Sequence, residues 1–200
     1  MNKIAFALVS PIILCTSVAM TGCSTVQYGD AQKVETVTTE FGSTDLQTTA
    51  ANMVDSMLSF PPIVKATQNK RPVMFVDTIK NKSMEHIDTE SLTDTISTKL
   101  LRSGKFRFVD MTKVETIKNQ LQYQNESGMV DPSTSTAFGK QIGADYMLYG
   151  NLSSIVKRDN STKDVYYKIT LKLMDVETGL VEWQDEQEIR KVKSKKLFGG

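Results

Sequence analysis

Residues 165–189 read VYYKITLKLMDVETGLVEWQDEQEI, and this stretch decides the fold. From 165 to 176, apolar and polar side chains alternate, the pattern of a strand with one buried face. Glu177-Thr178-Gly179 predicts a turn, and 180–189 reads as the returning strand, in which we expect Trp183 to pack in the core. The stretch therefore predicts an antiparallel hairpin. The side chains expected on one side of the first strand are Tyr167, Ile169, Leu171, Leu173 and Asp175.

Residues 145–156 precede this hairpin and predict a third strand, joined to it by a turn at Asp159-Asn160-Ser161. Further upstream, two short strands are expected at 72–77 and 105–109. The first is a short apolar run, and the second alternates polar and apolar residues. The chain is therefore expected to be α/β: a mixed sheet with helical crossovers, then an antiparallel three-strand meander, with helices packed on the sheet.

Helical patterns fill the space between these strands. Thr44 is expected to cap a helix over 45–59, which Pro61-Pro62 stop. Asp88 begins a second helix that ends at Ser103-Gly104, and a Thr112/Glu115 capping box opens a third. The third helix is expected to pack through Val114, Ile117 and Leu121. A fourth, after a loop over 124–133, carries Phe138 and Ile142 and closes at Gly143.

The first 23 residues, MNKIAFALVSPIILCTSVAMTGC, have the organisation of an export signal. Lys3 supplies the positive start, and the uncharged stretch that follows is interrupted by Pro11 and is short for a membrane-spanning helix. Met20-Thr21-Gly22-Cys23 resembles a lipobox, although Met20 stands where Leu is usual. This resemblance implies cleavage after residue 22, with an S-diacylglycerol and an N-acyl chain such as palmitate on Cys23. Ser24 beside it favours sorting to the outer membrane.

The remaining composition sets the expected boundaries: signal peptide 1–22, lipidated terminus and flexible tether 23–43, α/β domain 44–190 and basic tail 191–200. Residues 24–43 are rich in Thr and Ser and show no sustained apolar period. Cys15 is lost with the leader, so Cys23 has no partner for an intramolecular disulfide. The net charge of +1 argues against nucleic acid as a partner.

No catalytic constellation is found in the sequence. His86 is a lone histidine without the partners that a zinc site needs. Phosphate loops, GxSxG and CxxC motifs are missing, and Ser154-Ile-Val-Lys157 spells SxxK in a predicted strand, not on a helix. We therefore expect no catalytic residue, no metal and no cofactor, which disfavours a wall hydrolase or transferase.

Several segments resemble the LpoB family in the order in which they occur. They are Val73–Asp77 with Asn81, Leu92–Leu101, Ser103–Phe106, Ile142–Tyr149 and Leu171–Trp183. The similarity covers roughly 44–190, and the same patterns resemble, more distantly, CsgG and the N-terminal domain of TolB. LpoB proteins are outer-membrane lipoproteins that activate a class A penicillin-binding protein, so the resemblance implies a non-enzymatic, periplasm-facing regulator of peptidoglycan synthesis. The tether is shorter than that of enteric members and lacks proline.

Two further expectations concern the partner. A docking patch is expected in the loop after the third helix and at the start of the next helix, where an exposed aromatic and a methionine stand among polar groups. Its residues are Tyr123, Asn125, Met129, Asp131, Pro132 and Ser133. The protein is expected to be monomeric. A CsgG-like secretion or assembly lipoprotein is the alternative, although the segment between 156 and 165 is short and polar for a membrane-inserting hairpin.

Overall fold

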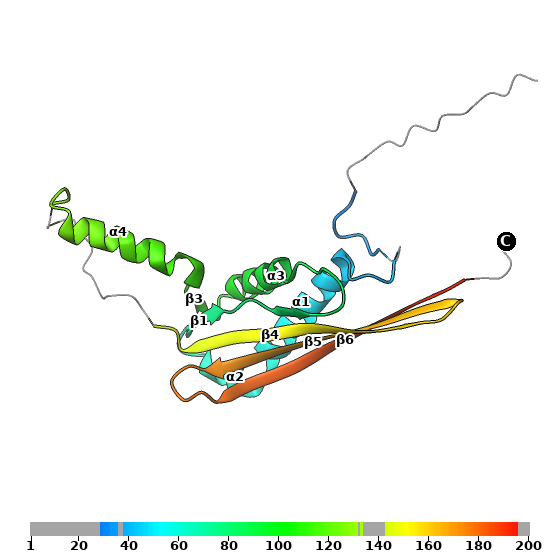
Figure 1. Ribbon diagram of the computed structural model, residues 1–200. Coiled ribbons are helices and arrows are strands. Elements are labelled where there is room, and N and C mark those ends of the chain that lie inside the picture. The colour runs from blue at the N-terminus through cyan, green and yellow to red at the C-terminus, as the bar shows by residue number, and fades with distance from the viewer. Residues whose placement is uncertain (1–28, 36–37, 132, 134–142, 196–200) are drawn as a thin grey trace, which may run out of the picture. The chain divides into compact units, whose positions relative to one another are not determined.

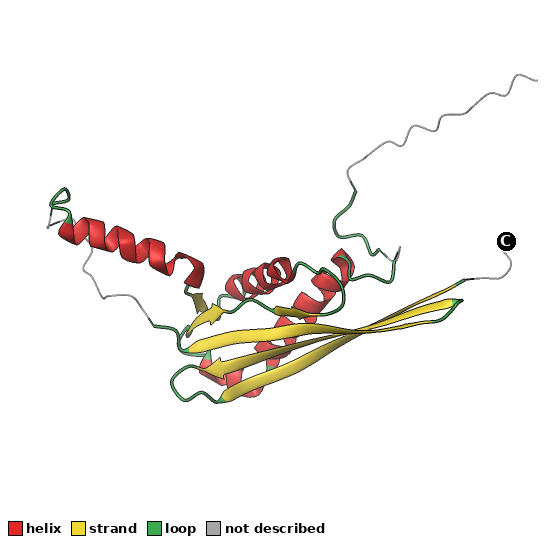
Figure 2. Cartoon of the chain, in the orientation of Figure 1, coloured by secondary structure: helices red, strands yellow, loops and turns green. Residues whose placement is uncertain are grey.

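The computed structural model describes residues 29–35, 38–131, 133 and 143–195 (Figure 1). Contacts divide the chain into units 1–31 and 32–200, and every helix and strand lies in the second unit. Figure 2 shows helices and strands by colour. The elements are α1 Ser43–Ser59, α2 Pro61–Ala66, β1 Val73–Val76, β2 Lys80–Lys82, α3 Thr89–Arg102, β3 Arg107–Phe108, the 3₁₀ turn η1 Met111–Lys113, α4 Val114–Glu126, β4 Tyr146–Arg158, β5 Thr162–Asp175 and β6 Val181–Ser194.

One six-stranded sheet organises the domain, in the order β3-β1-β4-β5-β6, with β2 also paired to β4. β1 runs parallel to β3 and β4, and α3 makes the crossover from β1 to β3. β4, β5 and β6 form the antiparallel meander. The mixed α/β sheet with helical crossovers and a final meander is therefore confirmed.

A single hydrophobic core joins α1 and α3 to one face of the sheet. The alternation along β5 is confirmed, because odd-numbered residues from Val165 to Leu173 are buried while their neighbours are half-exposed. Trp183 on β6 is 5% exposed and pairs with Leu173, as expected of a core residue. Among the described residues, those in or packed against the core lie between 41 and 189. They are chiefly Ala50, Met53 and Met57 of α1, Leu92, Ile96 and Leu100 of α3, and the inward side chains of β1, β4, β5 and β6.

Helix α3 begins and ends where its sequence signals predict. The Asp88 carboxylate accepts a hydrogen bond from the Ser91 backbone N–H at 3.1 Å, and Gly104 has φ +70°, a conformation that favours glycine. The expected cap at Thr44 is wrong, because α1 begins at Ser43. Thr44 Oγ1 accepts instead from the backbone N–H of Glu35 at 2.9 Å.

The capping box at Thr112 and Glu115 is also wrong. Thr112 donates its N–H and hydroxyl to Asp110 Oδ1, at 2.9 and 2.7 Å, so Asp110 caps a 3₁₀ turn before α4 begins at Val114. Asp110, one residue before the turn, accepts the hydrogen bond from the Thr112 backbone N–H that the predicted capping box assigned to Glu115. The expected fourth helix with Phe138 and Ile142 lies outside the described residues.

Two short elements were not predicted. Pro61 and Pro62 follow the end of α1 as expected, but they also form the first turn of α2. Proline fits there because the backbone N–H groups of a first turn have no hydrogen-bond partner within the helix. β2 consists of three exposed polar residues, Lys80–Lys82, which pair in parallel with Asn151–Ser153 of β4. Neither element has the apolar periodicity that identifies longer ones.

The meander strands are longer than expected. β4 continues to Arg158, β5 starts at Thr162 and β6 reaches Ser194. The boundary expected between domain and tail at residue 190 is therefore wrong for 191–194, which pair with 162–165 of β5. The backbone N–H of Lys195 donates to Ser161 O at 2.7 Å and holds the end of β6 against the hairpin turn.

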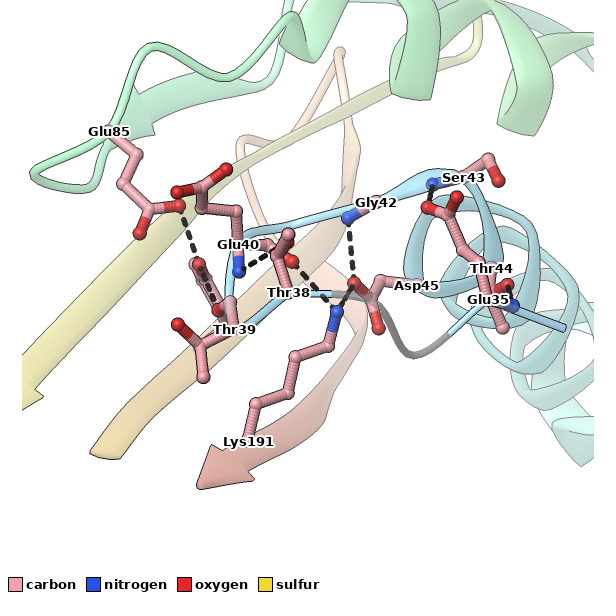
Figure 3. Close-up of polar contacts among 11 residues, drawn as sticks. Glu35, Thr38, Thr39, Glu40, Gly42, Ser43, Thr44, Asp45, Glu85 and Lys191 are labelled. Carbon is pink, nitrogen blue, oxygen red and sulfur yellow. Dashed lines mark hydrogen bonds and ion pairs between the residues drawn. The ribbon is translucent and has the colours of Figure 1, made fainter. Parts of the chain in front are cut away.

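The last part of the expected flexible tether is packed on the domain. We call residues 38–42 the N-terminal strap (Figure 3). Thr39 is 6% exposed, and its carbonyl oxygen lies 3.1 Å from the Tyr167 hydroxyl, which also lies 2.5 Å from a Glu85 carboxylate oxygen. Phe41 packs edge-on against the Tyr167 ring, with centroids 5.6 Å apart. Burial, then the bond to Glu85, raises the pKa of Tyr167, so its hydroxyl stays protonated and able to donate. The prediction of a flexible tether is thus wrong for the strap.

Candidate docking site

The most exposed helix of the domain is α4, which follows β3 and η1. None of its residues is buried. Ile117 and Tyr123 are 44% and 47% exposed, and Met111 in η1 just before it is 53% exposed. Val114, Ile117 and Leu121 were expected to pack as the helix's apolar face, but Val114 and Leu121 are only partly buried. An apolar helix face left open in this way is typical of an interaction surface.

Two residues of the expected docking patch lie on α4 itself. The loop expected from residue 124 starts later, because α4 continues to Glu126 and therefore includes Tyr123 and Asn125. The Tyr123 hydroxyl lies 3.6 Å from the sulfur of Met129, while Asn125 Nδ2 donates to Leu121 O at 2.8 Å. The structure thus brings Tyr123 and the 79%-exposed Met129 together at the end of the helix.

The polar part of the patch follows in the loop. Asp131 Oδ1 accepts hydrogen bonds from the N–H and the hydroxyl of Ser133, both at 2.8 Å. These bonds, the backbone one first, hold the pKa of Asp131 below its ordinary value, so this exposed carboxylate is charged at neutral pH. Pro132 lies outside the described residues. The described part of the patch therefore consists of an aromatic–methionine pair and a charged Asp–Ser turn.

Sequence reasoning missed the rest of the exposed apolar surface on η1 and α4. Met111 and Ile117 were not assigned to the patch, although their exposure is comparable to that of Tyr123. The signal was present, since the i, i+3, i+7 spacing of Val114, Ile117 and Leu121 marks an apolar helix face. Periodicity shows that such a face needs a partner, but it does not show whether the partner is the same chain or another one.

The side chains that could act in catalysis or bind a metal ion lie apart from one another. His86 is exposed, and Ser154 lies on β4, where its hydroxyl accepts from the backbone N–H of Met84 at 3.2 Å. Among the residues described, no three His, Cys, Asp or Glu side chains gather in a way that could hold a metal ion. Within the same residues, no helix has the length and apolarity required to cross a membrane. Cys23 and Ser24 lie outside the described part of the chain.

Comparison with known proteins places this domain in a family. The chain is 25% identical over 111 residues to the penicillin-binding protein activator LpoB of Salmonella typhimurium, covering 56% of this chain and 49% of that protein. It is also 25% identical over 139 residues to the LpoB protein of Cronobacter turicensis, covering 70% and 57% respectively. The chain thus spans about half the length of the curated relatives it matches.

Solved structures include the LpoB C-terminal domain from Salmonella enterica, with a TM-score of 0.45, 21% identity, and coverage of 72% of this chain and 98% of that one. The NMR structure of Escherichia coli LpoB gives a TM-score of 0.41 at 18% identity, with coverage of 98% and 94%. The family model described as peptidoglycan-synthase activator LpoB matches residues 45–189. Because that match runs from the first turn of α1 almost to the end of β6, the chain belongs to the LpoB family.

Proposed function

We propose that this protein binds and activates a bifunctional peptidoglycan synthase, a class A penicillin-binding protein, and so regulates cell-wall synthesis. The observation that carries the proposal is the family match over residues 45–189. The curated relatives are named penicillin-binding protein activators. The protein acts by binding and not by catalysis of its own, and it does so as a monomer.

Activation without catalysis is a linkage effect. A bound regulator raises the activity of an enzyme only if it binds the active conformation more tightly than the inactive one. The regulator must therefore offer a surface with both affinity and specificity. The exposed apolar face of α4, with Tyr123 and Met129 at its end and the charged Asp131 beyond, offers both kinds of contact.

We place the protein at the outer membrane, facing the periplasm, held by acyl chains on Cys23. The sequence Met20-Thr21-Gly22-Cys23 and the following Ser24 support this placement. The strap revises how far the domain can reach from such an anchor. Since the strap begins at Thr38, only 15 residue steps separate it from Cys23, a reach of at most ~54 Å even when fully extended.

Reconstitution with the cognate synthase tests the activator function. The lipidated chain, added to the synthase with lipid-linked precursor, is expected to increase the rates of glycan polymerisation and cross-linking. A synthase that neither binds the chain nor changes its rate would refute the activator function. Labelling with radioactive palmitate tests the anchor separately, since Cys23→Ala should abolish incorporation.

A matched pair of variants tests the docking patch. Tyr123→Ala with Asp131→Lys is expected to weaken synthase binding at least tenfold, the usual scale for losing an interface aromatic together with a charge reversal nearby. Phe60→Ala with Asp55→Lys likewise removes an exposed aromatic ring and reverses one aspartate charge, on α1 and at its end, and should leave affinity unchanged. Equal affinities for the two double variants would exclude this patch as the docking surface.

A further inference from the structure

Cations form a row across the far end of the meander. Arg158 on β4 lies directly opposite Lys163 on β5, and Lys163 lies directly opposite Lys193 on β6. Lys195 follows Lys193 at the point where its backbone N–H donates to Ser161 O. We call Arg158, Lys163, Lys193 and Lys195 the basic row. They line a hollow of about 150 Å³ together with the hairpin turn 159–162.

This arrangement is electrostatically unfavourable in the isolated chain. Like charges directly opposite one another on antiparallel strands destabilise the pairing. Two neighbouring cations are paired: Arg190 with Asp164, and Lys191 with Asp45. Within the described residues, by contrast, no member of the basic row has a carboxylate within ion-pair distance.

Acidic groups do lie nearby. Glu40 and Glu85, with His86, share a second hollow with Arg158 and Lys163, yet neither carboxylate comes within 4.0 Å of a basic-row cation. Asp159 is engaged by Ser161 and Thr162 in the hairpin turn, and these bonds lower its pKa. The four cations of the row therefore have no direct ion-pair partner among the described residues and can bind an anion from outside the chain.

The opposite face of the same strands carries exposed apolar side chains beside the Arg190–Asp164 ion pair. Ile155 and Val192 are 59% and 55% exposed, and Tyr166 lies directly opposite Ile155. Alternation along the strands places these side chains on the face away from the helices, one or three positions from the nearest member of the basic row on the same strand. The tip of the meander thus carries cations on one face and exposed aliphatic and aromatic side chains on the other. A tip that enters an anionic bilayer interface end-on contacts headgroups with the first set and the apolar region with the second.

The N-terminal strap enters the domain beside the row. Lys191 Nζ donates to Glu40 O at 2.7 Å, and Glu40 and Phe41 line the hollow that includes Arg158 and Lys163. The strap is also the part of the described domain that leads back towards Cys23. If Cys23 carries the proposed anchor, the lipid surface that holds it lies within the ~54 Å reach of this end of the sheet.

We propose that the basic row, with Ile155, Tyr166 and Val192, is a contact site for anionic phospholipid that holds the meander tip on the membrane. This deepens the proposed function, on whose lipid anchor it rests. β4 begins beside β1, at the end of the sheet from which β3 leads to α4, and reaches the basic row at Arg158, the last of its 13 residues (Figure 1). A membrane contact at the tip therefore leaves α4 at the opposite end, free to meet a synthase.

Vesicle binding of a chain without acyl groups tests the proposal. A chain that starts at Ser24 keeps every core residue and every strap contact, so it should fold. It is expected to co-sediment with vesicles of phosphatidylglycerol and phosphatidylcholine but not with vesicles of phosphatidylcholine alone. Raising the salt from about 0.1 M to about 1 M shortens the screening length from roughly 10 Å to roughly 3 Å and should release it.

A charge-matched pair of variants locates the site. Lys163→Glu with Lys195→Glu is expected to lower binding to anionic vesicles about tenfold or more. Lys65→Glu with Lys70→Glu makes the same net-charge change at exposed positions of α2 and beyond, and should bind nearly as well as the parent chain. The first variant alternates the charges along the row and should unfold at or above the parental temperature, so a loss of binding cannot be assigned to unfolding.

Three results would overturn the proposal: equal binding by the two double variants, equal binding to neutral and anionic vesicles, or displacement from vesicles by inorganic phosphate at the concentration of lipid phosphate. The last would identify free phosphate as the ligand. The assay contains neither the acyl anchor nor a synthase. Its failure therefore differs from failure of the proposed function, which palmitate labelling and synthase stimulation report.

Discussion

The ammonium group of Lys191, near the end of β6, lies 2.5 Å from the Asp45 carboxylate in the first turn of α1, with side-chain exposures of 19% and 9%. The same carboxylate oxygen accepts the Gly42 backbone N–H at 2.7 Å. One charge pair therefore closes the first turn of α1, holds the strap and joins both to the last strand, as Figure 3 shows.

Lys191→Met should lower the free energy of unfolding by about 3 kcal/mol, because it leaves Asp45 buried without its counter-charge. Urea denaturation followed by circular dichroism measures the change. Lys168→Met is the control: its partner Glu186 is 38% exposed, so its loss should cost less than ~1 kcal/mol. If the free energy of unfolding fell equally in the two variants, burial would not make the Lys191–Asp45 pair more stabilising than the exposed Lys168–Glu186 pair.

Removal of the N-terminal segment should have two distinct effects. Deleting 24–34 shortens the reach from the proposed anchor and should reduce synthase activation in cells, with a smaller loss of stability than the longer deletion causes. Deleting 24–42 also removes the strap, so the Tyr167 hydroxyl loses the Thr39 carbonyl and the Tyr167 ring loses its contact with Phe41. The free energy of unfolding should fall by about 2 kcal/mol. Thermal unfolding of both deletions measures this. Identical unfolding temperatures would mean that the strap adds nothing to the fold.

The segment 110–144 between β3 and β4, which includes α4, should not be needed for folding of the domain. Val109 N–H donates to Met74 O at 2.9 Å and Asp145 N–H donates to Val73 O at 2.8 Å, so the segment leaves and re-enters beside β1. Replacing 110–144 with a short Gly/Ser linker should give a domain that still folds cooperatively but no longer binds the synthase. Calorimetry and a pull-down provide the two measurements. Full activation by this variant would exclude α4 as the docking element.

Acid should weaken the β5–β6 turn through Asp175. The N–H and hydroxyl of Thr178 donate to its carboxylate at 2.8 and 2.9 Å, and these bonds lower the pKa of Asp175. Because the pKa of Asp175 is lower in the folded state, its ionised carboxylate stabilises the fold fully above the ordinary pKa of about 3.9. This stabilisation is lost as the pH falls through the folded-state pKa. Asp175→Asn should therefore reduce the loss of stability below about pH 4. Unchanged acid unfolding curves for this variant would exclude Asp175 from the acid response.

The elements that the sequence predicted are those with a local signature. Alternation along 165–176 identifies β5, and Asp88 and Gly104 mark the ends of α3, because the interactions behind these signals span only a few residues. The strap has no such signature, since its partners Tyr167 and Lys191 lie more than 120 residues along the chain. A single aromatic, Phe41, in a Thr-rich segment was the available hint. The exposed apolar face of α4 was predicted only in part, because exposure depends on tertiary packing that periodicity does not report.

The position of β1 in the sheet has a consequence for the order of folding. Neighbouring meander strands are joined by short turns, whereas β1 pairs Met74 with Tyr146, 72 positions away. The entropy cost of closing a loop grows with its length, so the meander should form first and β1 should insert late. Until then, the edge of β4 has no strand beside it. The nascent domain is therefore most open to mispairing along β4, and Met74→Ala should accelerate unfolding far more than it slows folding.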